Sequence, residues 1–144
     1  MSSVMRVVFD TSTLVSAALR VGSIPHQALT HALNIAEVCV CAATFAELDE
    51  VLMRTKFERY QPSDVRQEFA DFVRLRATWF DVPETQIATV NPPCRDPKDN
   101  QFLALCQACA ATVLVSSDAD LLVLHPWHGI PILTPATFLQ ANTP

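Results

Sequence analysis

Glycine is scarce in this chain: only Gly22 and Gly129 occur among its 144 residues. A nucleotide-binding loop needs several glycines close together, so that backbone N–H groups can approach the phosphates. Two glycines this far apart can form neither a G-x-G-x-x-G sequence nor a P-loop. The scarcity therefore excludes a nucleotide cofactor held in such a loop.

Long apolar runs and an even set of cysteines are also missing. No apolar stretch approaches the roughly 18 residues that span a bilayer, and Met1-Ser2-Ser3 leads through Arg6 into a short strand-like run. We therefore expect neither a membrane span nor a signal peptide. The five cysteines lie mostly within apolar runs, as free buried thiols do, and no second C-x-x-C pair completes a zinc site. These features predict a protein of the reducing cytoplasm.

Positive charge is limited and unevenly placed. The net charge is −5, and all ten Lys and Arg residues lie at or before Lys98. A broadly basic nucleic-acid surface is thereby excluded, so a phosphate-bearing partner has to be held locally or through a metal ion. Arg54, Lys56, Arg95 and Lys98 are candidates for local phosphate contacts, with solvated surface charge as the alternative for each. For the nearby Arg59 we expect solvated surface charge.

The chain does contain a regular alternation of strand-like and helix-like segments. Short runs rich in β-branched residues are followed by segments with apolar residues three or four positions apart. This alternation predicts one α/β domain, residues 1–144, with a parallel sheet flanked by helices. Strands are expected at residues 5–9, 37–42, 112–115 and 132–133, with an ambiguous segment at 82–90 that resembles an edge strand. Helices are expected at residues 13–20, 24–34, 98–111 and 119–124, and from residues 44, 62 and 135 onward.

Acidic residues stand just beyond three of the expected strands. Asp10 follows Val7-Val8-Phe9, Glu47 follows the second strand, and Asp118 with Asp120 follows the third. The carboxyl ends of parallel strands meet at one edge of a sheet, where the crevice for ligands opens. Carboxylates gathered there repel one another unless a hard divalent cation such as Mg²⁺ or Mn²⁺ lies between them. The sequence therefore predicts a metal site, to which Asp99 is a less certain contributor because it precedes a helix.

Each acid also has an ordinary interpretation at the start of a helix. Thr44-x-x-Glu47 fits a capping box, and Asp96-Pro97-Lys98-Asp99 fits an N-cap followed by a first-turn proline. Asp10 and Asp120 stand at similar positions. Capping acids should scatter to both edges of a sheet, whereas Asp10, Glu47 and Asp118 all follow strands. Capping and metal binding do not exclude each other, so both interpretations stay open.

Five sequence blocks, in this order, resemble the PIN domain family, and more narrowly the VapC-like toxin components of bacterial toxin–antitoxin systems. They are Val7-Val8-Phe9-Asp10-Thr11-Ser12-Thr13-Leu14-Val15-Ser16-Ala17, Phe45-Ala46-Glu47-Leu48, Arg95-Asp96-Pro97-Lys98-Asp99-Asn100-Gln101-Phe102-Leu103, Ser116-Ser117-Asp118-Ala119-Asp120-Leu121-Leu122, and Ile132-Leu133-Thr134-Pro135 with Phe138-Leu139. The resemblance spans nearly the whole chain.

The resemblance implies a Rossmann-like α/β/α sandwich and a metal-dependent endoribonuclease that hydrolyses phosphodiester bonds in RNA. It implies that Asp10, Glu47, Asp99 and Asp118 are catalytic and that Asp10, Asp99, Asp118 and Asp120 bind Mg²⁺ or Mn²⁺. Ser12, Ser117 and Asp96 are expected beside these ligands. Two departures concern the same neighbourhood: Ser12 stands where the family usually has Asn, and Ser116-Ser117 where a Thr-Gly pair is common.

The resemblance also implies partners. These are an RNA substrate, a cognate antitoxin protein that covers the active-site groove in a type II toxin–antitoxin pair, and a second copy of the chain in a homodimer. The alternative is a PIN-fold protein of little or no catalytic activity, which acts as a protein- or RNA-binding module.

Overall fold

Five parallel strands form the central sheet in the computed structural model, which describes residues 4–142. The expectation about the first three residues lies outside this range. The strands follow the spatial order β3-β2-β1-β4-β5. Their bounds are Arg6–Phe9 for β1, Glu37–Val40 for β2, Thr78–Trp79 for β3, Val113–Val115 for β4 and Ile132–Leu133 for β5. The predicted α/β fold with a parallel sheet is confirmed.

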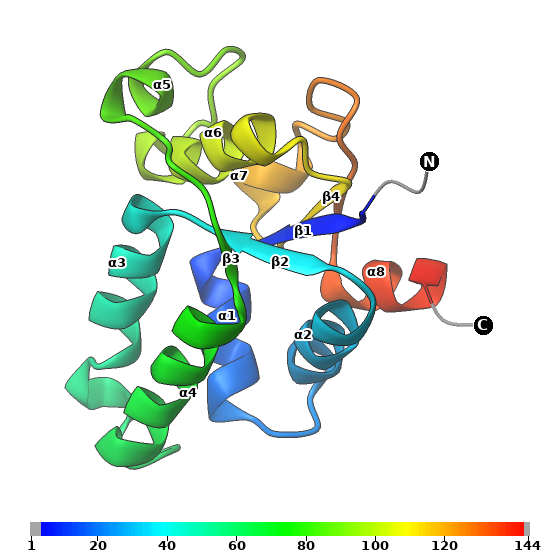
Figure 1. The fold of residues 1–144 in the computed structure, drawn as a ribbon. Helices are drawn as coiled ribbons and strands as arrows, with labels where there is room; N and C mark the ends of the chain where they lie inside the picture. Colours follow the sequence, from blue (N-terminus) through cyan, green and yellow to red (C-terminus); the bar gives the residue numbers. More distant parts are fainter. Residues whose placement is uncertain (1–3, 143–144) are drawn as a thin grey trace.

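Helices cover both faces of this sheet (Figure 1). One face carries α1 (Thr11–Leu19), α2 (Ile24–Ile35), α3 (Ala42–Leu52), α4 (Ser63–Arg76) and α8 (Pro135–Asn142). The other face carries α5 (Glu84–Ala88), α6 (Asn100–Cys109) and α7 (Ala119–Leu122). Two single 3₁₀ turns, η1 (Thr55–Phe57) and η2 (Pro97–Asp99), precede α4 and α6. The layers follow from the order of the chain, because each crossover between parallel strands places its helices on one face.

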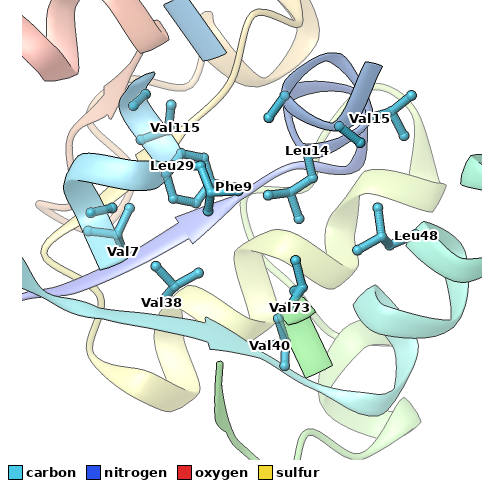
Figure 2. Packing of buried hydrophobic residues seen from close by; sticks show 14 of the residues in the cluster. Val7, Phe9, Leu14, Val15, Leu29, Val38, Val40, Leu48, Val73 and Val115 are labelled. Atoms are coloured by element: carbon cyan, nitrogen blue, oxygen red, sulfur yellow. The ribbon is translucent and has the colours of Figure 1, made fainter. Parts of the chain in front are cut away.

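Successive strand residues point to opposite faces and so build two separate cores. In β1, Val7 and Phe9 pack on the side of α1 to α4, where Figure 2 shows them together with Val38. The intervening Val8 packs with Phe102 of α6 on the other side. Both faces of each central strand are therefore buried, and this explains why the strands appear in the sequence as continuous apolar runs.

The order of the strands creates a switch point between β1 and β4. From β1 the chain proceeds outward through β2 to β3, then crosses the sheet and continues through β4 to β5. Phe9 pairs with Val115 in the parallel register, so Asp10 and Ser116 leave the sheet side by side. A crevice for ligands is expected outside the carboxyl ends of strands at such a switch point.

The suggestion of an edge strand within residues 82–90 is wrong. The edge strand β3 is the earlier pair Thr78–Trp79, after which the Phe80 N–H continues the ladder to the Val40 carbonyl at 2.9 Å. Pro83 then precedes the short helix α5, whose first residue, Glu84, suits the positive end of a helix. Partly buried Ile87 packs against the second core, so one apolar contact of a short helix resembled a strand in the sequence.

The proposed capping box at Thr44 and Glu47 is also wrong in register. Helix α3 begins at Ala42, and the backbone N–H of Cys41 donates to Thr44 Oγ1 at 3.1 Å. The cap therefore lies three residues earlier than expected, and the side chain of Glu47 is left for another role. In contrast, Asp10 does cap the helix that follows it, although that helix starts at Thr11.

The cysteines behave as the sequence predicted, since all five are free and buried. All five, including Cys94, pack in the core between the sheet and α6. None of the helices between residues 4 and 142 combines the length and apolar character that a membrane span requires.

Candidate active site

A cavity of about 510 Å³ opens at the carboxyl ends of β1 and β4. Asp10, Glu47, Asp99 and Asp118 all line it, although they come from four separate segments of the chain. We call these four residues the acidic centre. The remaining lining includes Thr11, Ser12, Val15, Ser16, Leu19, Val51, Arg54, Lys56, Phe57, Asp96, Lys98 and Phe102.

Asp10 is the most deeply buried carboxylate, with 3% of its surface exposed. Its Oδ1 accepts the backbone N–H of Thr13 at 3.0 Å and the hydroxyl of Ser12 at 3.4 Å. Its Oδ2 accepts the hydroxyl of Ser116 at 2.5 Å. Burial raises the pKa of Asp10, the bonds from Ser116 and Thr13 lower it, and the charge of Asp118 raises it further. Asp10 is thus fixed in place by three donors while its charge is poorly solvated.

Glu47 reaches the same cavity from α3. Its Oε1 accepts the hydroxyl of Thr11 at 2.5 Å. Thr11 is the first residue of α1, directly after Asp10. The hydroxyl that follows the buried aspartate therefore orients a second carboxylate, which lies 36 positions further along the chain.

Asp99 lies at the junction of η2 and α6, and its environment strongly favours the protonated form. Burial, followed by the neighbouring charge of Asp118, raises the pKa of Asp99 to about 7, with smaller contributions from Asp96 and Glu47. The raised pKa therefore reflects burial first and the crowding of like charges second. Such a group would accept a proton or a cation near neutral pH.

Asp118 caps α7 and connects to Asp10 through one hydroxyl. Its Oδ1 accepts the backbone N–H of Asp120 at 2.9 Å, and its own N–H donates to Ser116 Oγ at 2.9 Å. Because the same Oγ donates to Asp10, the fully buried Ser116 fixes the relative positions of both carboxylates.

The structure separates the other sequence candidates into two groups. Ser12 and Asp96 line the cavity, and Asp96 also caps η2 by accepting the Lys98 N–H at 3.0 Å. Asp120 and Ser117 do not line it: Asp120 is half-buried behind Asp118, and Ser117 is exposed to solvent.

Two functional contacts were missed in the sequence. The hydroxyl beside Asp10 and Asp118 belongs to Ser116, whereas Ser117 was expected beside the ligands. Thr11 donates to Glu47, and the sequence carries no signal for this contact between distant segments. The parallel register of β1 and β4 carries the signal for Ser116, because it pairs the residues that directly follow Phe9 and Val115.

The candidate phosphate-binding residues also differ in their surroundings. Lys56, Lys98 and Arg54 line the cavity, whereas Arg95 is exposed outside it. Arg54 forms an ion pair with Glu50, with Nη2 and Oε2 3.0 Å apart. Within residues 4–142 neither lysine forms an ion pair, so the lysine charges have no carboxylate partner.

The donor chemistry of the acidic centre suits a hard divalent cation. Its carboxylate oxygens are the ligands that Mg²⁺ and Mn²⁺ prefer, and a cation would relieve the repulsion that raises the pKa of Asp99. Within residues 4–142, no three His, Cys, Asp or Glu side chains already converge closely enough to hold a metal ion. The acids therefore surround the cavity with the appropriate atoms but in an open arrangement.

A parallel α/β sheet with carboxylates gathered at its switch point defines a class of Rossmann-like domains with an acidic cleft. A family model described as PIN domain matches residues 6–120, which include every strand but β5 and the whole acidic centre. The chain belongs to the PIN domain family. No curated protein sequence matches it.

Solved structures share this fold at low sequence identity. VapBC2 from Rickettsia felis, bound to a DNA fragment from its promoter, is 12% identical with a TM-score of 0.63, covering 89% of this chain and 97% of its own. PAE2754 from Pyrobaculum aerophilum is 12% identical with a TM-score of 0.60, covering 94% and 88%. VapC20 from Mycobacterium tuberculosis, a toxin that cleaves the sarcin–ricin loop, is 13% identical with a TM-score of 0.57, covering 83% and 95%. These similarities establish the fold, and the activity has to be argued from the site.

Proposed function

We propose that this protein is a metal-dependent endoribonuclease and the toxin of a type II toxin–antitoxin pair. The observation that carries the proposal is the acidic centre, in which four carboxylates from separate segments line one cavity and the pKa of Asp99 is raised to about 7. Crowded like charges destabilise a fold unless a cation or a proton offsets them. PIN domains are typically metal-dependent nucleases, which supports the same conclusion.

In this proposal Asp10, Asp99 and Asp118 hold Mg²⁺ or Mn²⁺, with Glu47 and Asp120 beside them. When bound, such an ion supplies a nucleophilic water near neutral pH and offsets charge on the phosphoryl oxygens. Ser116 holds Asp10 relative to Asp118, and Thr11 holds Glu47 toward the cavity. These hydroxyls keep the carboxylates oriented, so less reorganisation is needed when substrate arrives.

The RNA backbone would be held by the cations that line the cavity. Lys56 and Lys98 are exposed and have no carboxylate partner within the described chain, so they are available to phosphates. Arg54 is less available to phosphates because it already forms an ion pair with Glu50. Such contacts position a strand without selecting its sequence, and the outlying Arg95 would act only on a longer substrate.

An antitoxin is the proposed protein partner, and a second copy of the chain completes a homodimer. VapBC2, which shares the fold, is a toxin–antitoxin complex. A basic side chain of the antitoxin, inserted among the four acids, would offset their charge as a metal ion does. Helix α4 exposes Phe72 and Leu75 while Val73 of the same helix is buried, so part of its apolar surface is available for a contact between copies.

The direct test is RNA cleavage by the purified protein with Mn²⁺, with Mg²⁺ and with EDTA. Asp99→Asn removes one carboxylate of the acidic centre and retains its size, and Asp81→Asn is the matched control because Asp81 is exposed outside the cavity. We expect metal-dependent cleavage that falls by about 10³-fold in Asp99→Asn, since a catalytic metal contributes several kcal/mol. The Asp81→Asn variant should retain full activity.

Cleavage that persists in Asp99→Asn would contradict the assignment of the acidic centre. If the folded protein binds metal but cleaves none of a mixed set of structured and single-stranded RNAs, the binding-module alternative is favoured. A purified complex with the product of a neighbouring reading frame would then test the antitoxin separately from the chemistry.

A further inference from the structure

A second cavity, of about 420 Å³, adjoins the acidic cavity along α1. Ser16, Leu19 and Phe57 line both cavities, so the two lie side by side. Beyond Phe57 the second cavity is lined by Arg20 and Tyr60, with Ser23 and Pro25 at the start of α2. A chain-like ligand bound at the acidic centre could therefore extend past Phe57 without leaving the surface depression.

The second cavity is lined by an exposed aromatic ring and one cation, Arg20, and a second cation, Arg59, lies near the same ring. Tyr60 is 43% exposed. The guanidinium carbon of Arg20 lies 5.7 Å from the centre of the Tyr60 ring, and that of Arg59 lies 5.3 Å from it. Within residues 4–142 neither arginine forms an ion pair. Arg59 is exposed, as expected of solvated surface charge, and it lies over the same ring as Arg20. The positive charge of both arginines is left for an anion.

Residues 54–61, which include Arg59 and Tyr60, are held in place by hydrogen bonds from a buried arginine. Arg66 of α4 is only 1% exposed. Its guanidinium donates to the carbonyls of Leu52 at 2.8 Å, Gln61 at 3.0 Å and Arg54 at 3.3 Å. These bonds fix both ends of residues 54–61, so the ring of Tyr60 belongs to an ordered part of the surface. A preorganised ring loses little entropy when it binds a ligand.

An exposed ring beside guanidinium groups is the arrangement on which single-stranded nucleic acids bind. Every nucleobase has a π face that stacks on an aromatic or guanidinium plane, and the arginine charge attracts the adjacent phosphate. The bases of a duplex are already stacked and are not available for this contact.

We propose that the cavity between α1 and residues 54–61 is a nucleotide subsite. In it, Tyr60 and Arg20 hold the base of a single-stranded RNA whose neighbouring phosphate lies at the acidic centre, and Arg59 adds charge. This inference rests on the proposed ribonuclease function and narrows its substrate to RNA that is unpaired next to the cleavage point.

Tyr60 is the only tyrosine in the chain, which permits a direct measurement. Labelling with 3-fluorotyrosine gives a single ¹⁹F resonance that reports on this cavity alone. Into labelled Asp99→Asn protein with Mg²⁺ we would titrate a single-stranded RNA of about eight nucleotides, within the site sizes usual for such proteins. We expect the resonance to shift and saturate with the single strand and to stay in place with a blunt duplex of equal length.

Affinity for the same RNA, measured by fluorescence anisotropy, tests the energetic contribution of the ring. We expect Tyr60→Leu to weaken binding about tenfold and Tyr60→Phe to stay within about twofold, because stacking needs the ring and not the hydroxyl. Arg76→Gln is the matched control, since Arg76 also lies over an exposed ring, that of Phe72, but outside both cavities. It should bind RNA as the parent does.

The outcomes separate this inference from the proposed function. An unmoved resonance, or unchanged affinity of Tyr60→Leu, overturns the subsite even when metal-dependent cleavage is intact. A saturable shift in the labelled variant, together with no RNA cleavage by the parent protein, supports the subsite and overturns the proposed nuclease function. Absence of both overturns both proposals.

Discussion

The acidic centre and the cationic segment at residues 54–61 line the same depression, but the fold holds them in different ways. Asp10 directly follows β1, Asp118 follows β4 after Ser116 and Ser117, and the buried Ser116 joins the two acids. The cationic segment lies in the connection between α3 and α4, and its ends are fixed by the guanidinium of Arg66. The sheet thus places negative charge in a buried position, whereas a loop displays positive charge to solvent.

This difference has electrostatic consequences. Asp10 after β1 and Asp99 at the start of α6 are partly desolvated, and their pKa values are raised. The loop cations Lys56 and Arg59 are exposed, so water and salt screen them. The repulsion among the acids favours binding of a metal ion at the acidic centre. The exposed cations favour binding of an extended polyanion beside it.

The largest expected effect tests how the loop is held. Arg66→Met removes a buried guanidinium that donates to the carbonyls of Leu52, Gln61 and Arg54, of which the last retains the Phe57 N–H as a donor. We expect a loss of about 3 kcal/mol in the free energy of unfolding, because these are hydrogen bonds to a charged group. Urea unfolding measures the loss, and amide exchange should accelerate in residues 54–61. The surface variant Arg76→Met should be close to neutral; equal losses in both variants would show that Arg66 has no special role.

The next effect tests how the acids are held. Ser116→Ala removes the hydroxyl that donates to Asp10 and accepts from the Asp118 N–H, so we expect a loss of about 2 kcal/mol. Ser117→Ala is the matched control, because this neighbouring serine is exposed, and it should stay within about 0.5 kcal/mol of the parent. RNA cleavage should fall in the first variant only. A larger loss of stability and cleavage in Ser117→Ala than in Ser116→Ala would mean that Ser117 orients the acids.

A smaller effect, of opposite sign, tests the stored repulsion. The folded-state pKa of Asp99, about 7, lies above its ordinary value of 3.8, so folding is favoured where this carboxyl is protonated in both states. That contribution is lost as the pH rises through about 7. In metal-free buffer at pH 8, Asp99→Asn should therefore stabilise the fold, by about 1 kcal/mol once solvent screening is allowed for.

Thermal unfolding at pH 5 and pH 8 measures this difference. The advantage of the variant should shrink at the lower pH, where the parent carboxyl is already protonated. The exposed acid Asp81 provides the comparison, since Asp81→Asn should show no such dependence. A variant less stable than the parent at pH 8 would mean that Asp99 is held by favourable contacts.

The smallest effect concerns the exposed cations. Lys56→Gln should leave stability within about 0.5 kcal/mol. It should lower the salt dependence of RNA binding by about one unit of slope, because one phosphate contact is lost. Arg54→Gln should change the slope less, since Arg54 is already paired with Glu50. If the parent protein, Lys56→Gln and Arg54→Gln showed the same salt dependence of binding, the RNA would bind away from both cations.

Strand and helix order was predictable because both faces of the central strands are buried and the apolar runs are therefore unmistakable. The two elements that were misassigned depend on few residues. The segment around α5 packs on the core through few apolar residues, Val82, Ile87 and Val90, and β3 has two residues. In such short segments, packing against the neighbouring elements decides between helix and strand.

The sequence by itself determined that Asp10 and Asp118 would follow strands of a parallel sheet, since strand polarity alone brings such residues to one edge. It could not determine that Ser116 joins them, that Thr11 bonds to Glu47, or that Thr44 caps α3 in place of Glu47. These contacts depend on strand register and on the exact start of each helix. Only the tertiary structure brought Arg20, at the C-terminal end of α1, to Tyr60, because that contact depends on how helices pack and leaves no periodic pattern in the chain.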